Sequence, residues 1–177
     1  MKKTCHRMGW ILMGAVLLLG ACASMPDEET SALKTQADQA ADNKGVYHRF
    51  IELFEQGNWE EDLPKVICED CVLHYAGGED VVGLPAMIEG WATFFGAFKD
   101  MNVTPLAEMS EGDLVIEFFT FEAIYEGEFM DRQVTGLPIK YNQVEMVRIA
   151  DGKIVEWWVE EDRLTMMEQL GMEVVWK

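Results

Sequence analysis

The first regular pattern of apolar residues starts at Tyr47. Tyr47, Phe50, Ile51 and Phe54 are spaced i, i+3, i+4 and i+7, which places them on one face of a helix. Gly57 stands where a C-terminal cap is expected. Asp62 is expected to open a second, short helix, because Pro64 is tolerated in a first turn.

A stronger helical pattern predicts a helix over 84–99. Its apolar residues recur at i, i+4, i+7, i+11 and i+14, and they are Leu84, Ile88, Trp91, Phe95 and Phe98. Pro85 falls in the first turn, where a missing backbone N–H costs little.

The remaining pattern indicates strands rather than helices. A short strand is expected at 72–75, and four longer ones at 103–109, 114–125, 139–150 and 153–160. Glu111-Gly112-Asp113 and Asp151-Gly152 supply hairpin turns, whereas 126–136 is expected to be a longer loop. A final helix over 163–170 follows, with Asp162 as its cap and Gly171 at its end. Helices segregated from a run of antiparallel strands predict an α+β fold.

The last expected strand carries an unusual combination of side chains. Glu156, Trp158, Glu160 and Asp162 occupy every second position, so they would share one face. Acidic groups beside a tryptophan suit the lining of a small-molecule pocket better than a solid core, so we expect this face to line a pocket.

The N-terminus predicts a targeting segment. Lys2, Lys3 and Arg7 form a basic region, and an apolar run from Met8 to Leu19 follows that is too short to span a membrane comfortably. The sequence 19–22, Leu-Gly-Ala-Cys, resembles the bacterial lipobox, which implies that residues 1–21 form a signal peptide and that Cys22 carries lipid. The alternatives are an ordinary secretory signal or a short anchor. Ala23 after the cysteine is typical of sorting to the outer membrane in proteobacteria. We therefore expect the cell envelope, at the periplasmic face of the outer membrane.

Residues 22–44 are small or polar with almost no large apolar side chain, which indicates a flexible tether before a single domain at 45–177. The chain has 14 basic and 32 acidic residues. Loss of residues 1–21 removes three basic residues and no acid, so the formal net charge of −18 becomes −21. This balance argues against nucleic acid as a partner and against electrostatic docking on anionic lipid.

Two cysteines of the expected domain, Cys68 and Cys71, form a C-x-x-C pair. Such a pair can be structural thiols, a local disulfide or a redox site. No second Cys or His pair would complete a zinc site, so no metal is expected. Glu69 and Asp70 between them would raise the thiol pKa values, which disfavours a redox role.

The C-terminal pattern resembles the SnoaL-like polyketide cyclases, a branch of the NTF2-like superfamily. The matching residues are Arg148, Asp151, Gly152, Lys153, Ile154, Glu156, Trp158, Asp162, Gln169, Leu170 and Gly171, with 135–138 (Thr-Gly-Leu-Pro), 111–113 and His74 upstream. The resemblance covers about 45–171. It implies a cone-shaped NTF2-like fold, in which a curved antiparallel sheet wraps around the N-terminal helices and a pocket lies inside.

The resemblance also implies catalytic candidates. The family's Asp at the position of Asp162 is the general acid/base of a ring closure, although Asp162 could simply cap the last helix. His74 could shuttle a proton or be an ordinary satisfied polar residue. Glu145 and Glu156 would form a coupled carboxylate pair if both face inward, and ordinary solvated charges if not.

Five aromatic residues are candidates for substrate binding: Tyr47, Trp91, Phe95, Tyr125 and Trp158. Aromatics at regular spacing more commonly form the core, so both roles remain open for them. At Tyr125 the chain departs from the family, which often has a "G-T-H" motif there.

Two functions remain open. One is cofactor-free acid/base cyclisation, isomerisation or hydrolysis of a carbonyl or ester compound. The other is a non-catalytic module that binds a small hydrophobic molecule or forms a homodimer. The sequence contains no G-x-S-x-G, H-E-x-x-H, P-loop or G-x-G-x-x-G motif, so other enzyme classes have no support from motifs.

Overall fold

The computed structural model describes residues 27–56, 59–129, 132–172 and 175. The helices are α1 (Asp27–Gln56), α2 (Trp59–Val66), α3 (Leu84–Ala97) and α4 (Arg163–Gln169). The strands are β1 (Ile67–Tyr75), β2 (Val81–Val82), β3 (Phe98–Glu111), β4 (Leu114–Phe129), β5 (Arg132–Ala150) and β6 (Lys153–Glu161).

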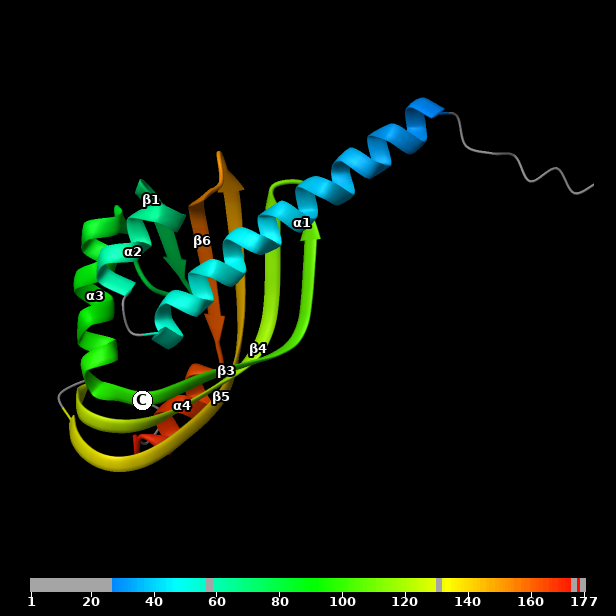
Figure 1. The fold of residues 1–177 in the computed structure, drawn as a ribbon. Coiled ribbons are helices and arrows are strands. Elements are labelled where there is room, and N and C mark those ends of the chain that lie inside the picture. The colour runs from blue at the N-terminus through cyan, green and yellow to red at the C-terminus, as the bar shows by residue number, and fades with distance from the viewer. Residues whose placement is uncertain (1–26, 57–58, 130–131, 173–174, 176–177) are drawn as a thin grey trace, which may run out of the picture.

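The strands form one curved sheet in the order β2-β1-β6-β5-β4-β3. Every neighbouring pair is antiparallel except β1 and β6, which run parallel, so the sheet is mixed rather than purely antiparallel. The long strands β3, β4 and β5 bend below α3, and α2, α3 and the C-terminal half of α1 lie within the curve, while the N-terminal half of α1 projects beyond the sheet (Figure 1). This is the expected α+β cone.

Helix α1 is attached to the sheet by polar contacts as well as by its apolar face. Tyr47 and Phe50 are buried, as the helical spacing predicts. Asn43 Nδ2 donates to the backbone oxygen of Gly112 at 3.0 Å, and Lys44 Nζ and His48 Nε2 lie 3.2 and 2.6 Å from the carboxylate of Glu108. The second half of α1 is therefore fixed against the β3–β4 hairpin.

The expectation of a flexible tether before residue 45 does not agree with the structure, because residues 27–44 are the first part of α1. The residues from 27 to 42 are exposed except Ala40. Their Ala, Glu, Gln and Lys content favours a helix, and a packed helix end lets the exposed part form without a new nucleus. The proposed signal peptide and Cys22 lie outside the described residues. No helix of the described chain is long and apolar enough to cross a membrane.

Other expected boundaries are also wrong. Strand β1 begins at Ile67 rather than at residue 72, and α3 ends at Ala97, so Phe98 opens β3 instead of continuing the helix. Helix α2 begins at Trp59 rather than Asp62, so Pro64 lies inside it. The expected loop at 126–136 is instead a hairpin, since β4 and β5 pair as far as Phe129 and Arg132. Gly127 does not end its strand: a Cβ there would lie 2.9 Å from Ala97 Cα, so glycine permits the end of α3 to pack closely.

Candidate functional site

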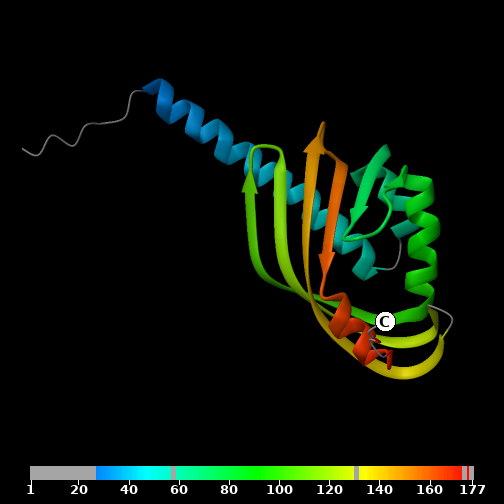
Figure 2. The same cartoon turned by 180° about the vertical axis from the view of Figure 1, so that it is seen from behind.

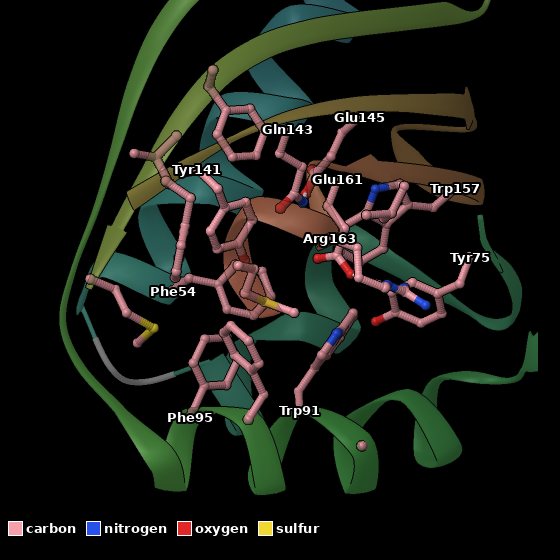
Figure 3. A pocket seen from close by; sticks show the side chains of 18 of the residues that line it. Phe54, Tyr75, Trp91, Phe95, Tyr141, Gln143, Glu145, Trp157, Glu161 and Arg163 are labelled. Atoms are coloured by element: carbon pink, nitrogen blue, oxygen red, sulfur yellow. Dashed lines mark hydrogen bonds and ion pairs between the residues drawn. The ribbon is translucent and has the colours of Figure 1, made fainter. Parts of the chain in front are cut away.

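A cavity of about 490 Å³ lies between the concave face of the sheet and helices α1 and α3 (Figure 3). Aromatic side chains form much of its wall: Phe50, Phe54, Tyr75, Trp91, Phe94, Phe95, Phe119, Phe121, Tyr141 and Trp157. Gly78 and Glu79, in the turn after β1, and Gly90 on α3 are also in the lining and are exposed, so they mark its mouth. This volume suits a small organic molecule.

Apart from Glu79 at the mouth, the polar part of the lining comes from one side of the cavity. Tyr75 is on β1, Tyr141, Gln143 and Glu145 are on β5, and Glu161 and Arg163 stand at the end of β6 and the start of α4. These residues converge opposite Phe54, Trp91 and Phe95 (Figure 3). The cavity thus has an apolar wall and a polar wall.

Glu145 is the deepest charged residue of this wall, with only 5% of its surface exposed. Its Oε1 accepts a hydrogen bond from Gln143 Nε2 at 2.6 Å, and its Oε2 lies 3.1 Å from the Tyr47 hydroxyl. Burial raises the pKa of Glu145 to about 8, although hydrogen bonds from Tyr47 and Gln143 oppose the rise. At neutral pH the carboxyl group is therefore mostly protonated.

The Tyr47 hydroxyl connects Glu145 to a second buried carboxyl group. It lies 3.2 Å from Glu117 Oε2 and 3.1 Å from Glu145 Oε2. A tyrosine hydroxyl has one hydrogen to donate, so it can satisfy two ionised carboxylates only in part. Burial also raises the pKa of Glu117, and burial together with the two carboxyl groups keeps Tyr47 protonated. Both contacts are hydrogen bonds if one carboxyl group is protonated, so Glu117, Tyr47 and Glu145 together hold an acidic proton beside the cavity.

The polar wall contains a second carboxyl group, that of Glu161. Glu161 lies opposite Gln143 in the β5–β6 register, and its side chain is 14% exposed. Arg163 holds it with Nε at 2.9 Å and Nη2 at 2.8 Å from Oε1. The polar wall therefore contains one carboxyl group protonated by burial and another that is ion-paired with arginine.

The expectation that Glu156 and Trp158 face the pocket is wrong. On β6 the buried residues are Ile154, Trp157 and Val159, and Trp157 and Val159 line the cavity. Arg148 pairs with Glu156 while Ile149 pairs with Ile154, so Val155 is an extra, bulged residue that shifts the alternation by one position. Glu145 and Glu156 consequently lie on opposite faces and form no pair.

His74 also lies on the outer face of the sheet. It stacks on Trp158 with ring centroids 5.1 Å apart, and its two nitrogens contact Asp80 at 2.8 Å and Glu156 at 3.2 Å. Burial opposes its charged form, but the contacts with Asp80 and Glu156 raise the pKa of His74 overall. Arg148 bonds Glu156 at 3.0 Å and lies over the Trp158 ring. Because this cluster does not line the cavity, it fits the satisfied polar role of His74.

Asp162 is exposed and is not part of the cavity lining. Its Oδ1 accepts from the backbone N–H of Thr165 at 3.1 Å, which caps α4, and this bond lowers the pKa of Asp162. A general acid needs a raised pKa at neutral pH. Asp162 therefore has the position and the electrostatics of a helix cap.

The expected substrate-binding aromatics have different positions. Trp91 and Phe95 line the cavity. Tyr125 is fully buried in the core, where it stacks on Phe98 at 5.2 Å, and Tyr47 lies behind the wall as the partner of Glu145. Trp158 lies on the outer face of the sheet, where it stacks on His74.

Several residues of the site were not expected from the sequence. Tyr75, Tyr141, Gln143, Trp157, Glu161 and Arg163 line the cavity, and Glu117 lies behind the lining in contact with Tyr47. The sequence of β5 does carry a signal for Tyr141 and Gln143. Every second residue of this strand, from 141 to 149, lies on the inner face. Gln143 and Glu145 are therefore polar residues on a face that is otherwise made of Tyr141, Val147 and Ile149. The bulge at Val155 concealed the corresponding alternation in β6.

Cys68 and Cys71 are free thiols in the structure, half-buried and buried respectively. Burial raises the pKa of both, that of Cys71 to about 12. Since the thiolate is the reactive form, this agrees with structural rather than redox thiols.

The sequence model of the family described as SnoaL-like polyketide cyclase matches residues 44–170. No curated protein matches the chain. Among solved structures, IdmH of Streptomyces antibioticus, proposed to be a polyketide cyclase, is 29% identical with a TM-score of 0.64, covering 73% of this chain and 99% of its own. AclR of Streptomyces galilaeus, proposed to be a hydroxylase, is 26% identical with a TM-score of 0.66, covering 75% and 97%. A structure from Jannaschia is 20% identical with a TM-score of 0.68, and the match covers 76% of this chain and 95% of its own. This likeness shows a shared fold.

Proposed function

The chain belongs to the SnoaL-like polyketide cyclase family, and we propose that it binds a small hydrophobic ketone or ester and catalyses cofactor-free acid/base chemistry on it. Cyclisation, isomerisation and hydrolysis of such compounds share one requirement, a proton donor aimed at a carbonyl oxygen. The observation that carries the proposal is Glu145, a buried carboxyl group that lines an aromatic cavity with its pKa raised to about 8.

The two carboxyl groups of the polar wall suit complementary roles. Glu145 is kept protonated by burial, and Glu161 is ion-paired with Arg163. In an enolisation, Glu161 would take a proton from the carbon next to the carbonyl while Glu145 gives one to the carbonyl oxygen. Both transfers reverse when the product forms, so neither group is consumed. Carboxyl groups in contrasting environments commonly divide the acid and base roles in this way.

The Glu117–Tyr47–Glu145 contacts would restore the donor after each transfer. Tyr47 reaches both carboxyl groups at 3.1 and 3.2 Å, so a proton on either side of its hydroxyl remains within the same buried network. Glu117 is not in the cavity lining, so its role would be to share the charge rather than to touch the ligand. This arrangement moves the expected acid/base role from Asp162 to Glu145.

An exchange reaction tests this proposal before the natural substrate is known. α-Tetralone has a carbonyl group, an aromatic ring and exchangeable protons on the neighbouring carbon. In heavy water, NMR would follow deuterium uptake at that carbon. We expect the protein to accelerate the exchange, and Glu145→Gln to reduce the acceleration by about 10²-fold or more, because glutamine cannot give up and regain a proton.

The matched control is Glu156→Gln, which removes a carboxyl group from the other face of the sheet. It should leave the exchange rate unchanged, because Glu156 contacts His74 and Arg148 and not the cavity. If wild-type protein binds α-tetralone but exchanges it no faster than buffer, catalysis is contradicted and the non-catalytic binding module is favoured.

A homodimer is the second part of the proposal, and exposed apolar residues on the sheet support it. Met109, Phe118 and Val144 are 62%, 37% and 36% exposed. Seen from behind, strands β3 to β6 lie in front of α1 (Figure 2). Apolar side chains gathered on an outer sheet face are typical of an interaction surface.

We further propose attachment through a lipid on Cys22 to the periplasmic face of the outer membrane, on the basis of the sequence around that cysteine.

A further inference from the structure

Three glutamates form a row across the inner face of the sheet. Glu108 lies directly opposite Glu117 in the register of β3 and β4, and Glu117 lies directly opposite Glu145 in the register of β4 and β5. Side chains at directly opposite positions share a face, and their Cβ atoms are about 4.5–5.5 Å apart. This glutamate row therefore runs from the edge strand β3 to the wall of the cavity, where Glu145 is part of the lining.

The two ends of the glutamate row differ in their access to solvent. Glu117 and Glu145 are only 3% and 5% exposed. The side chain of Glu108 is 19% exposed, and it contacts Lys44 and the largely exposed His48 at 3.2 and 2.6 Å. A proton can therefore enter the row from bulk water at Glu108, on a path that does not pass through the cavity.

The Tyr47 hydroxyl joins the two buried carboxyl groups of the glutamate row. It lies 3.2 Å from Glu117 Oε2 and 3.1 Å from Glu145 Oε2. A hydroxyl group can donate its own hydrogen to one oxygen while it accepts a proton from another, so it can pass a proton on without becoming charged. Gln143 also donates to Glu145, but a carboxamide has no proton to pass on.

The outer carboxyl group is near enough to the next one to affect its protonation. Burial is the main cause of the raised pKa of Glu117, and among the smaller causes the charge of Glu108 adds to the rise while that of His48 opposes it. The three carboxyl groups therefore interact from one end of the row to the other.

We propose that the glutamate row is a proton path, which reloads Glu145 from bulk water at Glu108 while a ligand fills the cavity. This inference rests on the proposed function, because it explains how the acid of that reaction regains its proton when an apolar ligand has displaced water from the cavity. Glu108 and Glu117 act through Glu145 and touch no ligand.

The transfer leaves every group of the path as it began. After Glu145 has given up its proton, Tyr47 passes its hydroxyl hydrogen to Glu145 and takes a proton from Glu117. Glu117 then takes a proton from Glu108, and Glu108 takes one from water. The net change is the movement of one proton from bulk water to the cavity wall.

Hydrogen exchange at the Glu145 carboxyl group tests the path. A protonated carboxyl group has a C=O stretch in the infrared that shifts when deuterium replaces the proton, and the band missing in Glu145→Gln identifies the one of Glu145. The protein would be mixed rapidly with heavy water, with and without tetralin, a hydrocarbon of two fused rings that has no titratable group. Tetralin at about ten times its dissociation constant, measured by calorimetry, leaves about a tenth of the cavities empty.

Tetralin should affect the variants of the row and not the wild type. In wild type the exchange rate should stay unchanged, because deuterium still arrives along the row. Glu117→Gln cannot pass on a proton, so its exchange requires an empty cavity and should slow about tenfold at that tetralin concentration. Glu108→Gln, a change at the exposed end that leaves the buried contacts of Tyr47 in place, should slow in the same way.

The matched control is Glu122→Gln, which removes an exposed carboxyl group of β4 that lies outside the row. It should behave as the wild type does. Without tetralin, heavy water reaches Glu145 through the mouth of the cavity, so all four proteins should exchange at similar rates.

Two results would overturn the inference and leave the proposed function standing. One is exchange in Glu117→Gln and Glu108→Gln that does not slow with tetralin, which would show another route to Glu145. The other is a wild-type rate that slows about tenfold with tetralin, because protons would then arrive through the mouth of the cavity. If no band of a protonated Glu145 exists at neutral pH, or if the cavity does not bind tetralin, the proposed function fails together with the inference.

Discussion

Replacement of Glu145 by glutamine should change how the stability of the protein depends on pH. The folded state holds a proton on Glu145 up to about pH 8, whereas the unfolded chain loses it near the ordinary value of 4.5. Between these values the folded state binds more protons, so the free energy of unfolding of the wild type falls as the pH rises. Glu145→Gln cannot ionise and lacks this loss, so the variant gains stability relative to wild type across the same range.

The size of the effect follows from the two pKa values. A difference of one pH unit corresponds to about 1.4 kcal/mol, so a pKa of about 8 against 4.5 sets an upper limit of about 5 kcal/mol. Water that enters the cavity, and adjustment of Tyr47 and Gln143, would lower the cost of ionising the group. We therefore expect the variant to gain about 2–4 kcal/mol over wild type between about pH 5 and pH 8.

Urea unfolding of both proteins at several pH values would measure this difference. The control is Glu122→Gln, because a hydrogen bond from Lys140 lowers the pKa of this exposed carboxyl group. Its wild-type contribution is present above about pH 4.5 and is lost as the pH falls, so its variant should show no gain between about pH 5 and pH 8. A difference between Glu145→Gln and wild type that stays constant over that range would refute the assignment of Glu145 as a buried, protonated acid.

Four further outcomes are expected. Trp91→Ala should lower the free energy of unfolding by about 3–5 kcal/mol, since Trp91 is a large buried aromatic, and a loss below about 0.5 kcal/mol in urea unfolding would contradict its packing. Asp162→Asn should leave stability nearly unchanged while Asp162→Ala costs about 0.5–2 kcal/mol, and equal losses would argue against the cap. Mass spectrometry of the mature protein should find acylated Cys22, and Cys22→Ala should release the domain from membranes; an unmodified N-terminus at another residue would contradict this. Phe118→Glu should convert a dimer to a monomer in analytical ultracentrifugation, and an unchanged mass would place any dimer contact elsewhere.

Features that depend on neighbouring residues could be predicted from the sequence. Asp151 and Gly152 have φ angles of 52° and 74°, the left-handed values that a two-residue hairpin turn needs. Trp91 is buried as the helical spacing requires, and Asp162 caps α4 through the backbone of Thr165. In each case the deciding sequence signal lies within a few residues of the position, so the local pattern carries the information.

Features that depend on pairing between distant segments of the chain could not be predicted from the sequence. The bulge at Val155 exists because of the register between β5 and β6, and it decides whether Trp157 or Trp158 enters the cavity. The network around Glu145 joins three elements, since Tyr47 is on α1, Glu117 on β4 and Glu145 on β5. Alternation along one strand shows which residues share a face. One inserted residue reverses which of the two sets points into the cavity beyond it, and the amino-acid composition gives no sign of this.

The exposed half of α1 sets a direction as well as a length. Residues 27–42 extend about 24 Å at the usual rise of a helix. The same helix continues without a break to Tyr47 and Phe50 in the core, so its axis is fixed relative to the sheet. A linker of random conformation would let an attached domain tumble, whereas this helix is a rigid spacer. A domain tied down at the N-terminal end of α1 would stand away from its point of attachment by the length of this exposed helix, and the mouth of its cavity would keep one orientation relative to the helix axis.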